Sequence, residues 1–372
     1  TKRACTPLMR GWMACSLGSS AWTWWGARAL PPSKCIKEDI TGVVRSVTAW
    51  GLSVGARWRR ALQQGKTRIL AASQPHLWQK TAQVAATGSS GFHRKPDNLA
   101  PMSIPILTDG AELDAMRLAG RLAGEVLDFL TPLVKPGVTT DELDKLAHDY
   151  MVDVQGCIPA PLNYAPGGHK PYPKSICASV NDAICHGIPN DRALKNGDIV
   201  NLDITVIKDG WHGDSSRMYV VGEGSIAAKR LCKITYEAMW KGIAQVKPGA
   251  RFGDIGHAIQ TFAESHGFSV VREYCGHGIG RKFHDEPQVL HYGRPGTLEE
   301  MKPGMIFTIE PMINAGKRDI KSKNDGWTVV TKDRSLSAQW EHMILVTETG
   351  YEVLTVSAGS PALPDFITAT KT

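Results

Sequence analysis

The sequence of 372 residues lacks the marks of several classes of protein. It has no uninterrupted apolar run of about 18 residues, so no membrane-spanning helix is predicted, and it has no heptad or collagen repeat, which excludes the fibrous classes. Its 8 cysteines form no C-x-x-C pair and follow no regular spacing, so neither a zinc module nor a disulfide framework is predicted. We expect a soluble globular protein from a reducing compartment, with most cysteines buried as free thiols.

Basic residues are in excess only at the beginning of the chain, although the formal net charge is +7. Residues 1–101 hold 15 of the 43 Lys and Arg but only 3 of the 36 Asp and Glu, which leaves 28 basic and 33 acidic residues in 102–372. The main part of the chain is therefore mildly acidic. We predict no groove for nucleic acid and no membrane-binding surface on it.

Residues 1–101 also differ in composition, because they hold 7 of the 11 tryptophans and show little helical or alternating periodicity. Three interpretations compete: an Arg-rich transit peptide, a secretory signal that ends near residues 27–29, and upstream sequence translated from a start codon assigned too early. We favour the third, because serine and glycine interrupt the apolar stretch and transit peptides seldom contain so many tryptophans. The expected organisation is a disordered or extraneous leader over 1–101, followed by one folded domain over 102–372 that begins at Met102.

The order of the predicted elements is typical of an α+β protein. Apolar residues at helical spacing predict helices over 109–130, 140–154 with Thr140 as its N-cap, 225–247 and 252–266. An Asp-Gly turn between two β-rich runs predicts a hairpin over 199–221, and further strands are expected near 269–274, 305–313, 327–331, 340–347 and 351–356. Two successive helix–helix–hairpin units are consistent with a duplicated architecture.

The predicted hairpin carries a carboxylate on each strand. With a two-residue turn, Thr205 faces Asp214 and Asp203 faces Ser216, so the two aspartates lie diagonally on one face with Cα atoms about 7–8 Å apart. Like charges at this distance repel each other. Either both are solvated on an exposed face of the sheet, or a cation lies between them, and the apolar neighbours of Asp203 favour the cation.

Two more carboxylates, Glu310 and Glu341, lie in segments that are otherwise typical of buried strands. A buried, unpaired carboxylate requires a shifted pKa, a basic partner or a metal ion, and Lys and Arg are sparse in these segments. The Gly-rich segment 273–284 adds His277 and His284. Four carboxylates and one neutral imidazole balance the charge of two divalent ions, which could be Mn, Fe(II), Co or Zn. The pattern therefore predicts a dinuclear metal site and metal-assisted hydrolysis.

Three long motifs identify the chain as similar to a known family. They are SICASVNDAICHGIP over 175–189, EYCGHGIGRKFHDEP over 273–287 and GWTVVTKDRSLSAQWEH over 326–342. Together they resemble the bacterial type I methionine aminopeptidases, from about Met102 to the end of the chain. The resemblance implies the pita-bread fold of creatinase and the aminopeptidases, an α+β fold with pseudo-twofold helix and antiparallel-strand units.

The same resemblance implies an activity and its setting. A metallo-aminopeptidase domain over 102–372 would remove the initiator methionine from chains with a small second residue, using two divalent ions (Co²⁺, Mn²⁺, Fe²⁺ or Zn²⁺). We expect a cytoplasmic monomer whose partners are nascent polypeptide N-termini, including those at the ribosome, and not nucleic acid or membranes.

Carried over position by position, the resemblance implies roles for individual residues. The five metal ligands would be Asp203, Asp214, His277, Glu310 and Glu341, with Asp214 and Glu341 bridging both ions, Asp203 completing one site, and His277 and Glu310 completing the other. Glu310 would also shuttle a proton, His186 would contact the substrate near the scissile amide, and His284 would bind the substrate carbonyl.

The resemblance also implies two further sets of residues. The pocket for the methionine side chain would be lined by Tyr164, Tyr172, Cys177, Phe283 and Trp327. One Na⁺ or K⁺ ion would be held by loop atoms of Asn181, Ala183 and Ser337. The chain departs from the family pattern in two places: segment 165–171, between the two tyrosines, is longer than usual, and Pro161 stands where a cysteine of the pocket is common.

Two alternatives use the same fold. An X-Pro aminopeptidase or prolidase shares the ligand set, but these enzymes usually carry a large folded N-terminal domain and a different spacing of histidines. A metal-free protein of this fold would bind peptides without hydrolysing them, yet here all five ligand types are present. We therefore favour the methionine aminopeptidase interpretation.

Overall fold

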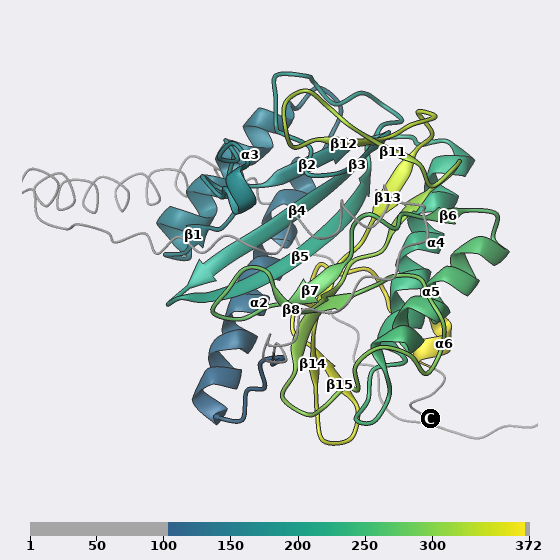
Figure 1. The fold of residues 1–372 in the computed structure, drawn as a ribbon. Helices are drawn as coiled ribbons and strands as arrows, with labels where there is room; N and C mark the ends of the chain where they lie inside the picture. The colour runs from purple at the N-terminus through teal and green to yellow at the C-terminus, as the bar shows by residue number, and fades with distance from the viewer. Residues whose placement is uncertain (1–102, 369–372) are drawn as a thin grey trace, which may run out of the picture. The chain divides into compact units, whose positions relative to one another are not determined.

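The computed structural model describes residues 103–368, and Figure 1 shows their arrangement. The predicted leader over 1–101 and the expected start at Met102 lie outside the described residues. The helices are α2 (Gly110–Leu130), α3 (Thr140–Asp149), α4 (Ile226–Ile243), α5 (Phe252–Ser265) and α6 (Asp365–Thr368), with short helical turns η2 (Thr131–Leu133), η3 (Tyr150–Val154) and η4 (Pro166–Gly168).

The strands include one long hairpin and many short segments. They are β1 (Ile158–Pro159), β2 (Cys177–Val180), β3 (Ala183–Cys185), β4 (Ile199–Lys208), β5 (Trp211–Val220), β6 (Ser269–Val270), β7 (Gly276–Gly278), β8 (Asp285–Val289), β9 (Ile306–Ile309), β10 (Met312–Asn314), β11 (Ile320–Ser322), β12 (Val329–Thr331), β13 (Ser337–Gln339), β14 (His342–Val346) and β15 (Tyr351–Val353).

The helices form close to where the sequence predicts them, with one correction. Helix α3 ends at Asp149, five residues before the predicted end, and one π-helical turn follows. Its N-cap is Thr139 and not Thr140: the Thr139 hydroxyl accepts a hydrogen bond from the Glu142 N–H, and the Glu142 carboxylate accepts one from the Thr139 N–H at 2.7 Å. This reciprocal pair is a capping box, which satisfies two donors at the start of the helix and so fixes the cap one residue earlier.

The predicted hairpin is confirmed in its register. Strands β4 and β5 pair antiparallel with Lys208 opposite Trp211, Thr205 opposite Asp214 and Asp203 opposite Ser216. Strands β1 and β2 pair with β4 on its other edge. The hairpin thus forms the centre of one sheet and brings both aspartates to the same face.

A second sheet has the strand order β15-β14-β9-β7-β8, and an isolated bridge between Ser216 and Glu341 connects it to the hairpin. In Figure 1, α2 and α3 lie on one side of the strands, while α4 and α5 lie on the other. Apolar clusters fill the space beneath both helix pairs. The predicted α+β class and pita-bread architecture agree with this arrangement. Within residues 103–368, no helix has both the length and the apolar composition that a membrane span requires.

The two buried glutamates lie at breaks between strands, which corrects the predicted strands over 305–313 and 340–347. Strand β9 ends at Ile309 and β10 begins at Met312, because Pro311 has no N–H to continue the ladder. Glu341 likewise lies between β13 and β14. The expected Gly-rich loop over 273–284 contains a strand as well, since His277 is the central residue of β7. Each break places a glutamate side chain in the space between the hairpin and the second sheet, where both line one cavity.

A buried ion pair fastens the C-terminal segment, and we predict that breaking it destabilises the protein. The Arg217 side chain is only 7% exposed and donates to Asp128 Oδ1 at 3.0 Å. Asp128 also accepts from the Ser357 hydroxyl at 2.8 Å and the Gly359 N–H at 3.0 Å. The Asp128→Ala variant should lose about 2–4 kcal/mol of unfolding free energy, measured by urea denaturation, because the buried guanidinium loses its charged partner.

A matched control for this variant is Asp114→Ala. The Asp114 side chain is 76% exposed in its ion pair with Arg117, so its loss should cost about 0.5 kcal/mol or less. Equal effects of the two substitutions would contradict the role assigned to the Arg217–Asp128 pair.

Candidate metal centre

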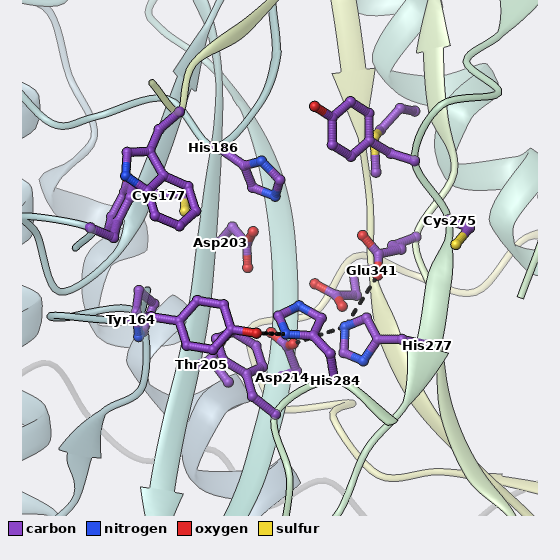
Figure 2. Close-up of a pocket in the computed structure, with 17 residues that line it drawn as sticks. Tyr164, Cys177, His186, Asp203, Thr205, Asp214, Cys275, His277, His284 and Glu341 are labelled. Carbon is purple, nitrogen blue, oxygen red and sulfur yellow. Dashed lines mark hydrogen bonds and ion pairs between the residues drawn. The ribbon is translucent and has the colours of Figure 1, made fainter. Parts of the chain in front are cut away.

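A cavity of about 60 Å³ lies between the β4–β5 hairpin and the sheet that contains β7, β9 and β14. The structure brings twelve of the predicted site residues to its wall: Tyr164, Tyr172, Cys177, His186, Asp203, Asp214, His277, Phe283, His284, Glu310, Trp327 and Glu341. Figure 2 shows Asp203, Asp214, His277 and Glu341 directed toward a common centre. Residues that are far apart in the sequence therefore line one cavity.

The hairpin supplies the two aspartates with different surroundings. Asp214 on β5 is 3% exposed, and its Oδ1 accepts a hydrogen bond from the Thr205 hydroxyl at 2.8 Å. Asp203 on β4 pairs in register with Cys177 of β2, which also lines the cavity. One oxygen of Asp214 is thus held in place by the neighbouring strand, and its other oxygen faces the second sheet.

His277 presents a free lone pair to the carboxylates. Its Nδ1 donates to the Gly278 carbonyl at 3.0 Å, so the hydrogen is on Nδ1 and Nε2 is the acceptor. Nε2 lies 3.7 Å from Asp214 Oδ2 and 3.6 Å from Glu310 Oε1. Burial lowers the pKa of His277 to about 4, which keeps the ring neutral. A neutral imidazole oriented by its other nitrogen is what a metal ligand needs.

Glu310 is held by three neighbours that the sequence did not single out. Its Oε1 accepts from the Thr308 hydroxyl at 2.9 Å, and its Oε2 accepts from Gln339 Nε2 at 3.0 Å. Its own N–H donates to His291 Nε2 at 3.1 Å. A signal for two of them was present, because Thr308 and Gln339 are polar residues two positions before a buried glutamate. Other lining residues outside the prediction are Pro161, Thr205, Tyr274, Cys275 and Met312.

The four carboxylates oppose each other's ionisation. Burial raises the pKa of Asp203 to about 7. Burial and the neighbouring carboxylates raise the pKa values of Asp214, Glu310 and Glu341 well above their usual range. Among the described residues, neither Lys nor Arg lines this cavity. Neutralisation must therefore come from protons or from bound cations.

The donor set fits divalent metal ions. Ligand atoms of Asp214, His277 and Glu341 all lie within 4.8 Å of one another, and the other two predicted ligands line the same cavity. Carboxylate oxygens with one imidazole nitrogen suit Mn, Fe, Co or Zn. The buried negative charge, the orientation of His277 and the hydrogen bonds to Glu310 all agree with a metal centre.

Two further histidines face the cavity in neutral form. Burial lowers the pKa of His186 to about 4. Burial and the nearby histidines lower that of His284 well below its usual range. His284 Nδ1 lies 2.8 Å from the Tyr164 hydroxyl, which fixes the ring (Figure 2). Both imidazoles can exchange hydrogen bonds with a bound peptide without adding positive charge beside the metal ligands.

Aromatic rings and a thiol form the remaining wall. The Tyr164 and Phe283 ring centroids lie 5.0 Å apart, and the Tyr172 and Trp327 rings form a T-shaped pair with centroids 5.2 Å apart. Cys177 is 8% exposed between them and the aspartates. Such a surface suits an unbranched, polarisable thioether.

The residues predicted to hold a monovalent cation lie outside this cavity. Asn181 and Ala183 line a separate groove of about 260 Å³. The Asn181 carbonyl accepts a hydrogen bond from the Ser337 N–H at 2.9 Å, so these two residues are adjacent. Asn181 is also tied by its side chain, whose Nδ2 donates to Asp198 Oδ1 at 2.8 Å.

Comparison with known proteins gives consistent results at the level of sequence and structure. The profile described as metallopeptidase family M24 matches residues 114–348. The chain is 59% identical over 257 residues to methionine aminopeptidase from Rickettsia prowazekii, covering 69% of this chain and 96% of that protein. It is 57% identical over 256 residues to methionine aminopeptidase from Escherichia coli K12, covering 68% and 95%.

A solved structure agrees with the sequence matches. The crystal structure of methionine aminopeptidase from Rickettsia prowazekii aligns with a TM-score of 0.66 at 58% identity, covering 68% of this chain and 100% of that one. The similarity thus extends over nearly the full length of these proteins.

Proposed function

The chain belongs to metallopeptidase family M24, and on this premise we propose that it removes N-terminal methionine from polypeptides whose second residue is small. The observation that carries the proposal is the cavity itself. It places five potential metal ligands, two neutral histidines and an aromatic wall suited to a thioether around one small space.

The metal ligands are proposed residue by residue. Asp203, Asp214, His277, Glu310 and Glu341 would hold two divalent ions, with Asp214 and Glu341 shared between them. When bound, such ions lower the pKa of water and polarise the carbonyl of the scissile bond. The metal could be Co²⁺, Mn²⁺, Fe²⁺ or Zn²⁺, since this donor set suits each of them.

The protein's own groups would manage protons and orientation. Glu310 has a raised pKa and both oxygens oriented by hydrogen bonds, so its carboxylate is suited to take a proton at Oε1 and return it to the leaving amine. His186, as a neutral imidazole, would hydrogen-bond near the scissile amide. His284, oriented by Tyr164, would bind the substrate carbonyl.

The proposal extends to a monovalent cation, the compartment, the oligomeric state and the partners. A Na⁺ or K⁺ ion would be bound by loop atoms of Asn181, Ala183 and Ser337. The enzyme would act in the cytoplasm, as a monomer, on nascent polypeptide N-termini, including those at the ribosome. The mildly acidic charge of residues 102–372 supports the view that neither nucleic acid nor a membrane surface is a partner.

We expect metal-dependent release of methionine from short peptides. The full chain would be stripped with a chelator and assayed on Met-Ala-Ser, with each divalent ion added back separately. At least one ion should raise the rate by about 100-fold or more over the chelated protein, because both activation of water and polarisation of the carbonyl depend on it. The Asp203→Ala variant should show no such recovery.

The same assay separates the alternatives. Hydrolysis of Ala-Pro-Ser in preference to Met-Ala-Ser would favour an X-Pro peptidase. Calorimetric binding of Met-Ala-Ser without hydrolysis under any ion would favour a metal-free peptide-binding protein. Either result would overturn the proposed function.

A further inference from the structure

The segment Ala165–Pro171, called the strap below, forms a closed loop beside the cavity. Its two ends are joined by hydrogen bonds from the Asn163 N–H to the Tyr172 carbonyl at 2.8 Å and from the Tyr172 N–H to the Tyr164 carbonyl at 2.9 Å. Gly167 and Gly168 inside it adopt φ values of +56° and +83°, which glycine tolerates without strain. The strap therefore follows a defined path from a fixed base.

The two tyrosines at the base of the strap both line the cavity. Tyr164 packs against Phe283 and hydrogen-bonds His284. Tyr172 is 2% exposed, and its hydroxyl donates to the Gly187 carbonyl at 2.9 Å. The base of the strap thus contacts both the segment between β7 and β8 and the segment that follows His186.

The tip of the strap fastens the Trp327 ring. The Lys170 carbonyl accepts a hydrogen bond from Trp327 Nε1 at 2.9 Å, and the His169 ring lies 5.4 Å from the indole. The Trp327 backbone N–H donates to Asp325 Oδ1 at 2.9 Å, which holds the main chain at this position. The Tyr172 and His186 rings make further T-shaped contacts with the indole.

Trp327 needs such support, because it lies in the connection between β11 and β12 and its side chain is only partly buried. A partly exposed indole with few fixed neighbours would change rotamer readily, and the width of the cavity would change with it. His169 and Lys170 are themselves exposed, so their contacts with Trp327 do not serve to fill the protein core. These contacts instead hold Trp327, which forms part of the cavity wall.

We propose that the strap sets selectivity for the side chain of the first substrate residue by holding Trp327 as a fixed wall. His169 is then a positioning residue that acts through Trp327. A fixed wall admits an unbranched side chain and excludes a branched one of similar volume, because the branched chain requires the wall to move. This inference rests on the proposed function and adds to it the element that determines specificity.

The test compares first-residue selectivity in variants of the full chain. For His169→Ala, KM for Met-Ala-Ser should rise about two- to tenfold, the range expected for loss of one aromatic pair, with kcat nearly unchanged. The ratio of kcat/KM for Met-Ala-Ser to that for Leu-Ala-Ser should fall by a similar factor. The inhibition constant of free L-methionine should rise in parallel, which gives a readout of the pocket that is independent of turnover.

Two matched variants separate the role of the ring from general damage. His169→Phe keeps an aromatic ring beside Trp327 and should restore the selectivity ratio. Lys170→Ala keeps the carbonyl acceptor and should behave as the wild type. By contrast, Trp327→Phe removes the indole donor and should lower the ratio at least as much as His169→Ala.

Each other outcome overturns the inference. If His169→Ala keeps the wild-type ratio while the wild type releases methionine, the strap does not set selectivity, although the proposed function stands. If KM rises equally for both peptides, the strap affects binding without selecting. If the wild type releases no methionine with any ion, the proposed function fails, and this inference fails with it.

Discussion

The Asp214→Asn variant is expected to be more stable than the wild type in the absence of metal, and inactive in its presence. Asp214 is 3% exposed and lies among three other buried carboxylates. An asparagine removes the charge but keeps an oxygen that can accept the Thr205 hydroxyl hydrogen bond. Relief of repulsion should raise the unfolding free energy of the chelated protein by about 2 kcal/mol, or the melting temperature by about 4–8 °C.

With divalent metal added, the order should reverse. The wild type gains stability that grows with the logarithm of the metal concentration divided by its Kd, whereas Asp214→Asn should gain little and lose at least about 100-fold in methionine release. Thermal unfolding with chelator and with Mn²⁺ measures both effects. The control is Asp209→Asn, which makes the same change of charge at the exposed turn of the same hairpin, where φ is +51° and asparagine is tolerated. A metal-free Asp214→Asn protein less stable than the wild type would contradict the prediction.

The chelated wild type should lose stability as pH rises above about 6.5. The pKa of Asp203 rises from 3.8 to about 7 on folding. Its stabilising effect is therefore complete below pH 4 and is lost as pH rises from about 4 to 7, for a total cost of up to about 4 kcal/mol, so only the last part of this loss falls above pH 6.5. Asp214, Glu310 and Glu341 act with the same sign, because their pKa values are also raised.

The buried histidines have the opposite effect on stability, because they lower the unfolding free energy as pH falls. The effect of the carboxylates is therefore measured above the pH at which the histidines contribute. The pKa values of His186 and His277 fall to about 4 on folding, so their effect on stability is lost as pH falls from about 6.5 toward 4. Above about 6.5 only the carboxylates contribute. There the unfolding free energy should fall by about 1.4 kcal/mol per pH unit for each carboxyl that keeps its proton in the folded protein and has lost it in the unfolded chain.

Urea denaturation of the chelated protein at several pH values between 6.5 and 8.5 measures this slope. Saturating Mn²⁺ should flatten it, since bound cations replace the protons. A slope that is the same with and without metal would show that the carboxylates ionise independently of the centre.

The β4–β5 hairpin could be predicted in full because its determinants are local. An Asp-Gly turn fixes the loop length, and the loop length fixes which residues face each other. The pairing of Thr205 with Asp214 follows, as does the diagonal placement of Asp203. The T-x-x-E pattern at Thr139 was equally local, and it would have placed the start of α3 correctly.

The second sheet could not be predicted in the same way, because its strands depend on distant contacts. Strand β7 consists of Gly276, His277 and Gly278, and glycine has low β-propensity. The structure shows why glycine stands there: a Cβ at Gly276 would collide with the Thr308 carbonyl, and one at Gly278 with the Glu286 carbonyl. The close approach of the neighbouring strands thus requires glycine at both positions. The same two glycines make β7 hard to predict as a strand from the sequence.

The site was predicted better than the sheets that build it. An Asp or Glu within an apolar segment is conspicuous in a sequence, because burying a carboxylate costs free energy in any fold. The neighbours of Glu310 stand out less, since Thr308, Gln339 and His291 matter only through contacts made after folding. The contact between the strap and Trp327 is likewise tertiary, and loop length was its one visible sign.

The bridge between Ser216 and Glu341 has a consequence for the order of events during synthesis. It joins the first hairpin to a residue near the end of the described chain, so the contacts that close the centre cannot form until Glu341 has left the ribosome. While Glu341 is still inside the ribosome, the nascent chain lacks one of its five proposed metal ligands. Because metal binding contributes to the stability of the folded state, capture of metal would mark the completed protein, and chains that terminate early would remain without peptidase activity.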